Sequence, residues 1–290
     1  MTDTPSPDWI ALDWQAGTLR FRAMQSGRAV AEKAVPCHAD KGALEAAIAE
    51  RLADWKTAPD TPLLMSGWPV GPEERAADVL RKVPCPPLEA AVRKLTLGPF
   101  TLQLVPGLRQ DDPPGVMQGE ETRIAGFLSL NANWDGVICL PGETTVWAQV
   151  SADEVVSFQT TLTGRLAALL EPDACPPAGS EAFDTALAAT LSRPEKLATR
   201  LSAIDAARSL GAQGKDDAQA LLWGGLIGAE LAATRAYWLG TQIAIIGETA
   251  ISALYARALA TQGAPATVAD PGRMTLAGLT RAHRLNTGSE

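Results

Sequence analysis

Two adjacent glutamates, Glu120 and Glu121, are the residues whose type and spacing point most directly to chemistry. They follow Gly119 and stand at the head of the apolar run 124–128, a pattern typical of a helix start with acidic residues in its first turn. A second interpretation is that one carboxylate faces a cleft and handles a metal ion, a proton or a substrate hydroxyl. Neighbouring helical residues point about 100° apart, so at most one of the two can do so. The sequence leaves both interpretations open.

Asp13 is the third carboxylate of interest, because it stands near the end of the apolar segment 9–14, which we expect to be a strand. Residues 15–18 then have the composition of a turn. A carboxylate at such a strand tip is often only a turn-capping residue that accepts backbone hydrogen bonds. The functional alternative is a metal-associated carboxylate at the mouth of a nucleotide cleft.

Histidine and cysteine chemistry has little support in this sequence. The two histidines, His38 and His283, have no neighbouring partner of catalytic type. The four cysteines are widely scattered and form no Cys-x-x-Cys pair, so we expect free thiols in a reducing cytoplasm rather than a zinc site or a disulfide framework. Carboxylates and backbone dipoles would therefore have to carry any catalysis.

The composition limits the class of protein. With 290 residues the chain is long enough for two domains, and a hydrophobic content of 46% suits a globular protein. The net charge of −8 argues against a nucleic-acid partner, which would favour a basic surface. Residues 1–5 do not resemble a signal peptide, and the apolar stretch 220–246 contains Glu230 and Arg235. We therefore expect a cytoplasmic protein without a membrane span, in which this stretch forms a buried helix and a strand.

The strands expected around the carboxylates form a pattern that occurs twice. An apolar strand, a turn of small residues and an alternating strand open the chain at 9–35 and recur at 137–160. The cluster 131–136 between them has turn composition and is the expected domain boundary. We therefore predict a structural duplication, with an N-terminal domain at 1–133 and a C-terminal domain at 134–290.

The longest expected helix, at 216–237, contains Gly224, Gly225 and Gly228. Each glycine costs a helix about 1 kcal/mol relative to alanine, so three of them indicate close approach of a backbone or a ligand, packing being the commoner cause. A strand, a turn at 247–249 and a helix follow, an arrangement that can place a ligand at the carboxyl end of a sheet. Apolar spacing predicts further helices at 41–55, 120–130, 163–170, 180–210 with a break near Pro194, 250–262 and 274–285, and strands at 62–67, 100–105, 242–246 and 266–269.

Seven short motifs stand in order along nearly the whole chain. They occupy residues 12–14, 18–20, 106–108, 116–122, 140–142, 161–164 and 225–230. In order and spacing they resemble the 2-dehydro-3-deoxygalactonokinase (2-keto-3-deoxygalactonate kinase) family. The most specific pieces are Met-x-Gly-Glu-Glu-Thr, ending at Thr122, and Gly-Leu-Ile-Gly-Ala-Glu, ending at Glu230.

The resemblance implies an α/β fold with two ribonuclease-H-like domains of the actin/hexokinase type around a cleft, each an actin-like ATPase domain. It implies a phosphotransferase of galactonate catabolism that moves the γ-phosphoryl group of ATP, with Mg²⁺, to the 6-hydroxyl of 2-dehydro-3-deoxy-D-galactonate. The expected partners are ATP and a small-molecule sugar acid, and a homo-oligomer is compatible with this expectation.

The resemblance also implies roles for individual residues. Asp13 would help to hold Mg²⁺, directly or through water, and Glu120 or Glu121 would contact the substrate or transfer a proton. The expected phosphate contacts are Gly17, Thr18, Gly142, Thr144 and Thr145; the expected adenosine contacts are Gly225, Gly247 and Thr249; the expected substrate contacts are Gly67, Trp68, Gly119 and Thr163.

Several positions depart from the pattern of the family. The second turn of the family usually reads Pro-Gly-Thr-His-Ser-Lys-Trp, whereas this chain has Pro-Gly-Glu-Thr-Thr-Val-Trp at 141–147. Gln15, Gln118 and Arg165 stand where the family has glycine, arginine and glutamate. Phosphoryl transfer depends on positioning and charge stabilisation, so the carboxylate at position 143 works against ATP. The alternative hypothesis is a non-catalytic protein of kinase fold that binds a sugar acid or a nucleotide.

Overall fold

The computed structural model describes residues 7–38, 40–68, 80–171, 176 and 179–288. The chain divides into two compact units: unit 1 comprises residues 1–133, 153–155 and 272–290, and unit 2 comprises residues 134–152 and 156–271. These units differ from the two predicted ranges mainly at the C-terminus, because the last helix packs with the first strands of the chain.

Unit 1 contains a six-stranded sheet with the order β3-β2-β1-β4-β7-β6. The first three strands form the expected meander, in which β1 pairs antiparallel with β2 and β2 with β3. On its other edge β1 pairs parallel with β4. The strands are β1 (Trp9–Gln15), β2 (Thr18–Gln25), β3 (Arg28–Pro36), β4 (Leu63–Ser66), β6 (Arg93–Leu97) and β7 (Phe100–Leu104).

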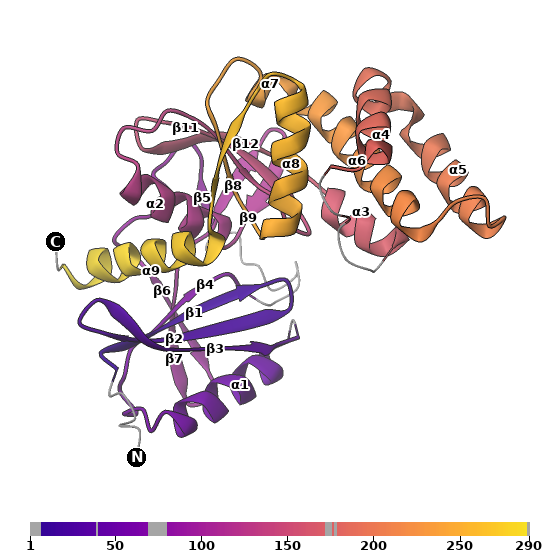
Figure 1. Cartoon of the computed structure of the whole chain (residues 1–290). Helices are drawn as coiled ribbons and strands as arrows, with labels where there is room; N and C mark the ends of the chain where they lie inside the picture. The colour runs from indigo at the N-terminus through magenta and orange to yellow at the C-terminus, as the bar shows by residue number, and fades with distance from the viewer. Residues whose placement is uncertain (1–6, 39, 69–79, 172–175, 177–178, 289–290) are drawn as a thin grey trace. The chain divides into compact units, whose positions relative to one another are not determined.

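The two faces of this sheet contact different helices, because successive residues of a strand point to opposite sides. Ile10 of β1 lies in a core shared with α1 (Lys41–Asp54), which runs along the sheet in Figure 1. Ala11 lies in a second core shared with α2 (Glu120–Leu130) and α9 (Pro271–Thr287). The sheet therefore holds α2, with its two glutamates, on the face opposite α1.

Helices α2 and α9 approach each other backbone to backbone. A Cβ atom at Gly126 of α2 would collide with the carbonyl oxygen of Met274, and one at Gly278 of α9 would collide with that of Thr122. This contact is the physical reason why residues 272–290 group with unit 1 and not with the C-terminal domain to which the sequence assigned them.

A separate three-stranded sheet of unit 1 leads the chain into α2. It consists of β5 (Arg81–Lys82), β8 (Leu108–Asp111) and β9 (Pro114–Met117), with β8 in the middle. The sequence did not predict this sheet, because its strands are very short and β5 pairs with a strand that follows only after β6 and β7. Helix α2 then begins at Glu120, as predicted.

Unit 2 is built on a five-stranded sheet with the order β12-β11-β10-β13-β14. Strand β10 pairs antiparallel with β11 and parallel with β13, as β1 pairs with β2 and β4 in unit 1. The strand order of unit 1 is thus repeated, which confirms the predicted duplication at the level of topology. The strands are β10 (Gly136–Leu140), β11 (Thr145–Ser151), β12 (Glu154–Thr161), β13 (Ile243–Ile246) and β14 (Ala266–Ala269).

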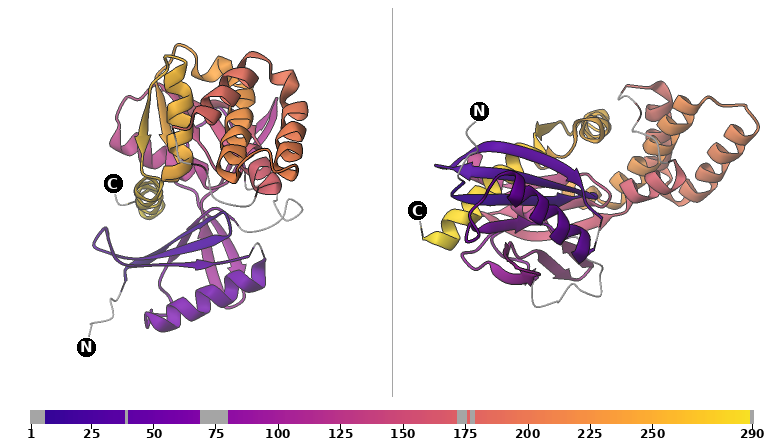
Figure 2. Two further views of the ribbon diagram at one scale, coloured as in Figure 1. Left: turned by 45° about the vertical axis from the view of Figure 1, so that its right-hand side comes forward. Right: turned by 90° about the horizontal axis from the view of Figure 1, so that it is seen from below.

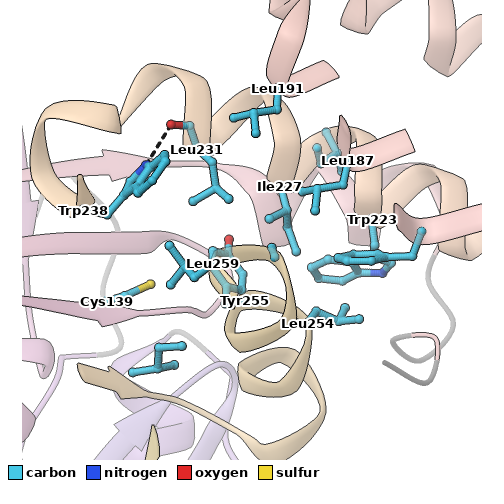
Figure 3. Close-up of a cluster of buried hydrophobic side chains, with 14 of the residues drawn as sticks. Cys139, Leu187, Leu191, Trp223, Ile227, Leu231, Trp238, Leu254, Tyr255 and Leu259 are labelled. Carbon is cyan, nitrogen blue, oxygen red and sulfur yellow. Dashed lines mark hydrogen bonds between the residues drawn. The ribbon is translucent and has the colours of Figure 1, made fainter. Parts of the chain in front are cut away.

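The main core of unit 2 lies between this sheet and its helices. Figure 3 shows Tyr255 and Leu259 of α8 among Cys139 of β10 and Ile227 and Leu231 of α6, all of them buried. The helices of this unit are α3 (Thr163–Leu170), α4 (Glu181–Ser192), the 3₁₀ turn η3 (Pro194–Lys196), α5 (Leu197–Ser209), α6 (Lys215–Ala233), α7 (Arg235–Trp238) and α8 (Thr249–Thr261).

Helices α4, α5 and α6 run side by side in unit 2 (Figure 2). A Cβ atom at Gly224 would collide with the carbonyl oxygen of Phe183, and one at Gly228 would meet the carbonyl oxygen of Leu187 in α4 at 2.5 Å. Packing is therefore the reason for these two glycines. The predicted helix at 216–237 is interrupted at Thr234, where α6 gives way to α7.

The apolar stretch 220–246 forms α6, α7 and β13. Across the described residues, no helix has both the length and the apolar character needed to cross a membrane. Cys37, Cys85 and Cys139 are free thiols, as expected, and the fourth cysteine, Cys175, lies outside the described residues.

Candidate active site

The ends of two parallel strands and the start of a helix meet at one point of unit 1. Gly67, directly after β4, has φ +75°, and a Cβ atom there would collide with the carbonyl oxygen of Trp14 in β1. Gly119, directly before α2, has φ +110°, and its Cβ atom would lie 3.6 Å from the Cα atom of Gly67 and 3.7 Å from Oγ of Ser66. Both glycines have a positive φ, which glycine adopts more readily than other residues, and Gly67 also lies too close to the Trp14 carbonyl for a side chain.

Glu121 closes the start of α2 with its own side chain. The Gly119 backbone N–H donates to both of its carboxyl oxygens, at 3.0 and 2.8 Å. The Thr122 hydroxyl donates to Oε1 at 3.2 Å and accepts from the Ser66 hydroxyl at 2.8 Å. Burial, together with the nearby charge of Glu120, raises the pKa of Glu121 from 4.5 to about 8. Glu121 therefore faces inward and satisfies donors at the helix N-terminus.

Glu120 is the more exposed of the two glutamates and lies beside a guanidinium group. Its Oε2 accepts a hydrogen bond from the Gln118 backbone N–H at 2.8 Å, and its Oε1 lies 3.4 Å from Nη2 of Arg123. With its amide oxygen turned toward Arg123, Gln15 accepts from both terminal nitrogens, at 2.7 and 3.1 Å. Arg123 thus bridges the end of β1 and the start of α2.

Asp13 lies half-buried at the end of β1, in surroundings that are largely positive. Burial raises the pKa of its carboxyl group above 3.8, and the charges of Arg123, Arg22 and Arg20 oppose that rise. Glu120 acts in the same direction as burial. One carboxylate from β1 and one from α2 are therefore electrostatically coupled around Arg123.

Gly17 and Thr18 lie on the turn between β1 and β2. Ala16 and Gly17 have φ values of 47° and 73°, and Gln15 pairs with Thr18, the features of a two-residue hairpin. The carbonyl oxygen of Gly17 accepts a hydrogen bond from the Cys37 backbone N–H at 2.8 Å. Gly17 is exposed and Thr18 half-buried, so this turn presents little beyond backbone to a ligand.

Trp68 is only 6% exposed and belongs to the core on the α1 side of the sheet. The indole packs against the core of the sheet, and the expected substrate contact of Trp68 stays a prediction. The loop residues that follow, 69–72, lie outside the described residues.

In unit 2 two glycines pack closely against the turn between β10 and β11. A Cβ atom at Gly164 would collide with the carbonyl oxygen of Gly142, and one at Gly247 would lie 2.7 Å from Cγ of Pro141. The Arg165 backbone N–H donates to the Glu143 carbonyl oxygen at 2.8 Å. The Glu143 side chain is exposed and Thr144 half-buried, which leaves both accessible to a ligand.

Thr145 and Thr163 are turned into the protein, and the expectation that their hydroxyl groups meet phosphate and substrate stays a prediction. Both side chains are buried. The Thr163 hydroxyl donates to Oε2 of Glu230. The Thr145 hydroxyl lies 2.9 Å from the Tyr255 hydroxyl, which itself donates to Oε2 of Glu230 at 2.8 Å.

The three residues that we expected to contact adenosine lie in two different places in unit 2. Gly247 and Thr249 stand at the start of α8, the first buried and the second exposed. Gly225 is buried in α6, and a Cβ atom there would lie 3.8 Å from Leu197 and 4.0 Å from Thr190, in α5 and α4. Gly225 therefore belongs to the helix packing of unit 2 rather than to the β13–α8 turn.

Two residues of these sites had no role in the sequence-based account. Arg123 follows Glu120 by three positions, the spacing that brings two residues to the same side of a helix, and this spacing is the signal that could have found it. Glu230 ends a recognised motif, but its partners come from Trp147, Thr161 and other positions far away in the chain. No local pattern predicts such a network.

The carboxylate of Asp13 is the type of ligand that a divalent cation such as Mg²⁺ prefers. Mg²⁺ prefers oxygen ligands, keeps several waters, and is commonly held by one or two carboxylates together with substrate phosphates. In the described part of the chain no cluster of three or more His, Cys, Asp or Glu side chains could hold a metal ion. Asp13 offers one carboxylate donor of the kind that Mg²⁺ takes, beside the guanidinium groups of Arg123, Arg22 and Arg20.

Comparison with known proteins gives a consistent result. Residues 13–282 match the family model described as 2-keto-3-deoxy-galactonokinase. Over 274 residues the chain is 28% identical to the 2-dehydro-3-deoxygalactonokinase of Escherichia coli (strain K12), covering 89% of this chain and 91% of that protein. It is 32% identical over 197 residues to DgoK1 of Rhizobium meliloti (strain 1021), a 2-dehydro-3-deoxygalactonokinase candidate. That match covers 63% of this chain and 64% of the relative, just under two thirds of its length.

Solved structures resemble both units together. A candidate 2-dehydro-3-deoxygalactonokinase from Sinorhizobium meliloti aligns with a TM-score of 0.85 and 25% identity, over 95% of this chain and 96% of the other. The activator of the 2-hydroxyisocaproyl-CoA dehydratase from Clostridium difficile, solved with bound ADPNP, aligns with a TM-score of 0.54 at 11% identity, which shows a shared fold alone. The repeated strand order and these likenesses establish an α/β fold of the actin/hexokinase type.

Proposed function

This chain belongs to the 2-keto-3-deoxy-galactonokinase family, and we propose that it transfers the γ-phosphoryl group of ATP to the 6-hydroxyl of 2-dehydro-3-deoxy-D-galactonate. In this reaction the bond between the γ-phosphorus and its bridging oxygen breaks, and a bond from the 6-oxygen to that phosphorus forms. ADP leaves, and the hydroxyl proton passes to a base or to solvent. The proposal fixes the acceptor class as a 2-dehydro-3-deoxy sugar acid.

The observation that carries the proposal is the coupled group at the end of β1. Asp13 and Glu120 lie on either side of Arg123, at the carboxyl end of a sheet strand and the N-terminus of a helix. Ligands of α/β proteins commonly bind at such strand ends, and the guanidinium group of Arg123 supplies positive charge there. A phosphorylated nucleotide and a sugar acid are both anions, so this arrangement supports their recognition.

Glu120 and Glu121 take different roles in this proposal. Glu121 is fully buried and accepts hydrogen bonds from Gly119 and Thr122, so we assign it the task of holding the start of α2. Glu120 is partly exposed, and its Oε1 lies within reach of Arg123. We assign Glu120 the contact with the substrate hydroxyl, where its carboxylate can accept the proton that leaves.

Mg²⁺ is the cofactor that the proposal requires, and Asp13 is the residue that would hold it. When bound, the cation neutralises charge on the phosphate oxygens. Burial disfavours the charged form of Asp13, while Arg123, Arg22 and Arg20 favour it. Burial is the larger of the two effects, so the pKa of Asp13 lies above its ordinary value although the guanidinium groups offset part of the rise.

The turn between β10 and β11 supplies the proposed phosphate contacts of unit 2. Gly142 and Thr144 offer backbone amides and one half-buried hydroxyl group. Because Thr145 is engaged with Tyr255, its hydroxyl group is left out of the proposal. Gly247 and Thr249, at the N-terminus of α8, remain the proposed contacts of the adenosine part.

The test is an assay of ADP release with Mg²⁺ and a panel of 2-dehydro-3-deoxy sugar acids. We expect ADP release that depends on the sugar acid and is fastest with the galactonate-derived compound. Nucleotide binding without turnover on any member of the panel would favour the alternative function, a non-catalytic protein of kinase fold. This alternative is tested because the exposed carboxylate of Glu143 lies on the turn where phosphate would bind.

A further inference from the structure

Glu230 of α6 is a buried carboxylate with four hydrogen-bond donors. Its side chain is 4% exposed. Oε1 accepts from Nε1 of Trp147 at 2.7 Å. Oε2 accepts from the hydroxyl groups of Thr161 at 2.7 Å, of Tyr255 at 2.8 Å, and of Thr163. Buried charges are costly unless they are paired or hydrogen-bonded, so a site with four donors is one built for a carboxylate.

The donors come from four different elements around the β10–β11 turn. Trp147 lies on β11, Thr161 ends β12, Thr163 begins α3, and Tyr255 lies in α8, where Figure 3 shows it in the core of unit 2. Glu230 therefore joins α6 to β11, β12, α3 and α8, and β11 directly follows the turn at residues 141–144.

Two routes lead from Glu230 to that turn. The first route passes through Thr163 to the two residues that follow it. Gly164 packs on the Gly142 carbonyl oxygen. The Arg165 backbone N–H donates to the Glu143 carbonyl oxygen at 2.8 Å. The second route passes through Tyr255 to Thr145, the residue that follows the turn. Because the Tyr255 hydroxyl donates to Glu230, Thr145 is the donor in the Tyr255–Thr145 bond.

We propose that Glu230 is a positioning residue for the phosphate-binding turn 141–144, and that it acts through Thr163 and Tyr255 on the phosphate groups of a nucleotide. This inference rests on the proposed function for the identity of the ligand. The network itself does not depend on that function. A neutral acceptor cannot replace the carboxylate, because the amide NH₂ of glutamine would face donors at one of its two positions.

The experiment compares Glu230→Gln and Tyr255→Phe with a control, Asp184→Asn. Tyr255→Phe keeps the ring in the core and removes only the hydroxyl group that links Glu230 to Thr145. Asp184 forms an ion pair with Arg257 that joins α4 to α8 in the same unit, away from the turn. The control therefore reports the effect of a general loss of stability in unit 2.

The first readout is amide hydrogen exchange at Arg165 in the full chain without nucleotide. We expect exchange about tenfold faster in Glu230→Gln, and faster in Tyr255→Phe at Thr145, with no change at either amide in Asp184→Asn. The second readout is calorimetric titration with Mg-ATP and with adenosine. We expect Mg-ATP to bind about tenfold more weakly to both turn variants, and adenosine to bind as it does to the wild type.

Unchanged exchange at Arg165 in a folded Glu230→Gln variant would overturn the positioning role. Equal weakening of adenosine and Mg-ATP would also overturn it, because the effect would then not concern phosphate. Failure of the wild type to bind Mg-ATP would contradict the proposed function, while the exchange result would still decide whether Glu230 holds the turn.

Discussion

The three carboxylates near the end of β1 and the start of α2 differ in what surrounds them. Asp13 is half-buried among three arginines, Glu120 is partly exposed beside Arg123, and Glu121 is enclosed by backbone and hydroxyl donors. Different surroundings give similar carboxyl groups different pKa values. One site can therefore contain both a charged cation ligand and an uncharged acid.

Asp13→Asn should abolish phosphoryl transfer and leave the fold intact. The substitution removes the charge that would bind Mg²⁺ and keeps the shape of the side chain, so we expect kcat to fall by roughly 10²- to 10³-fold or more. The measurement is sugar-acid-dependent ADP release, with a thermal unfolding curve as the control for folding. Turnover equal to that of the wild type at ordinary Mg²⁺ concentration would mean that Asp13 is only a turn residue.

Glu121→Gln should change the pH dependence of stability. The folded-state pKa of about 8 lies above the ordinary value of 4.5, so the stability that the protonated group contributes is fully present below about pH 4.5 and is lost as pH rises through about 8. A shift of this size corresponds to at most ~5 kcal/mol. Urea unfolding between pH 5 and 9 is the measurement. We expect the wild type to lose stability across this range and the variant to lose much less; parallel curves would show that Glu121 is ionised throughout.

Glu143→Thr should tighten the binding of ATP measured without Mg²⁺. A carboxylate close to a phosphate repels it, and because the Glu143 side chain is exposed and screened by solvent we expect an effect of roughly tenfold. Glu181→Thr, at the exposed start of α4, is the matched control for a change of net charge. Weaker binding in Glu143→Thr, seen only with Mg²⁺, would instead indicate that Glu143 binds the cation. The family lysine position, Val146, is not a site for a matching substitution, because this side chain is 1% exposed in the core.

At the scale of elements, glycines set the distances between neighbouring backbones. Gly126 and Gly278 permit the contact of α2 with α9, and Gly164 and Gly247 permit the close approach of α3 and of the β13–α8 turn to the turn that begins at Pro141. Each of these glycines packs against a backbone carbonyl or a rigid ring, so little relaxation is available to a larger side chain. Such contacts explain why some glycines lie in helices despite their low helix propensity.

Helix α6 offers a matched pair of substitutions that tests this explanation. Gly228→Ala places a methyl group against the Leu187 carbonyl oxygen in α4, whereas Gly225→Ala meets only side-chain atoms at 3.8 and 4.0 Å. We expect Gly228→Ala to destabilise the chain by about 1–3 kcal/mol. Gly225→Ala should be neutral or stabilising by up to ~1 kcal/mol. The midpoints of urea unfolding are the measurement, and equal midpoints for the two variants would refute the packing account.

The sequence predicted most elements of both units, because apolar spacing and turn residues are local signals. The start of α2 at Glu120, the break at Pro194 and the repeated meander were all predicted in this way. The sequence could not predict contacts between distant segments, such as the return of α9 to unit 1 or the donors around Glu230. It could not decide the role of Trp68 either, because an aromatic residue after a strand has the same pattern whether it packs inward or lines a pocket.

At the scale of the whole molecule, the repeated strand order accounts for the family likeness better than any single motif does. Both units place β1 or β10 between an antiparallel meander and a parallel neighbour, and the candidate residues lie at the ends of these strands. Two of the departures from the family pattern, Gln15 and Glu143, lie next to these strand ends, and the departures leave the strand order intact. They therefore bear on the rate and affinity of the reaction more than on the fold.

The central claim is phosphoryl transfer to the 6-hydroxyl, and ³¹P NMR of the product tests it most directly. The protein is incubated with Mg-ATP and 2-dehydro-3-deoxy-D-galactonate, and the spectrum is followed over time, with Asp13→Asn as the parallel sample. We expect one new phosphomonoester resonance, split by the two protons on C6, that grows in step with ADP in the wild type and is absent from the variant. An ATP spectrum that stays unchanged in the presence of folded wild-type protein and every sugar acid of the panel would contradict the claim.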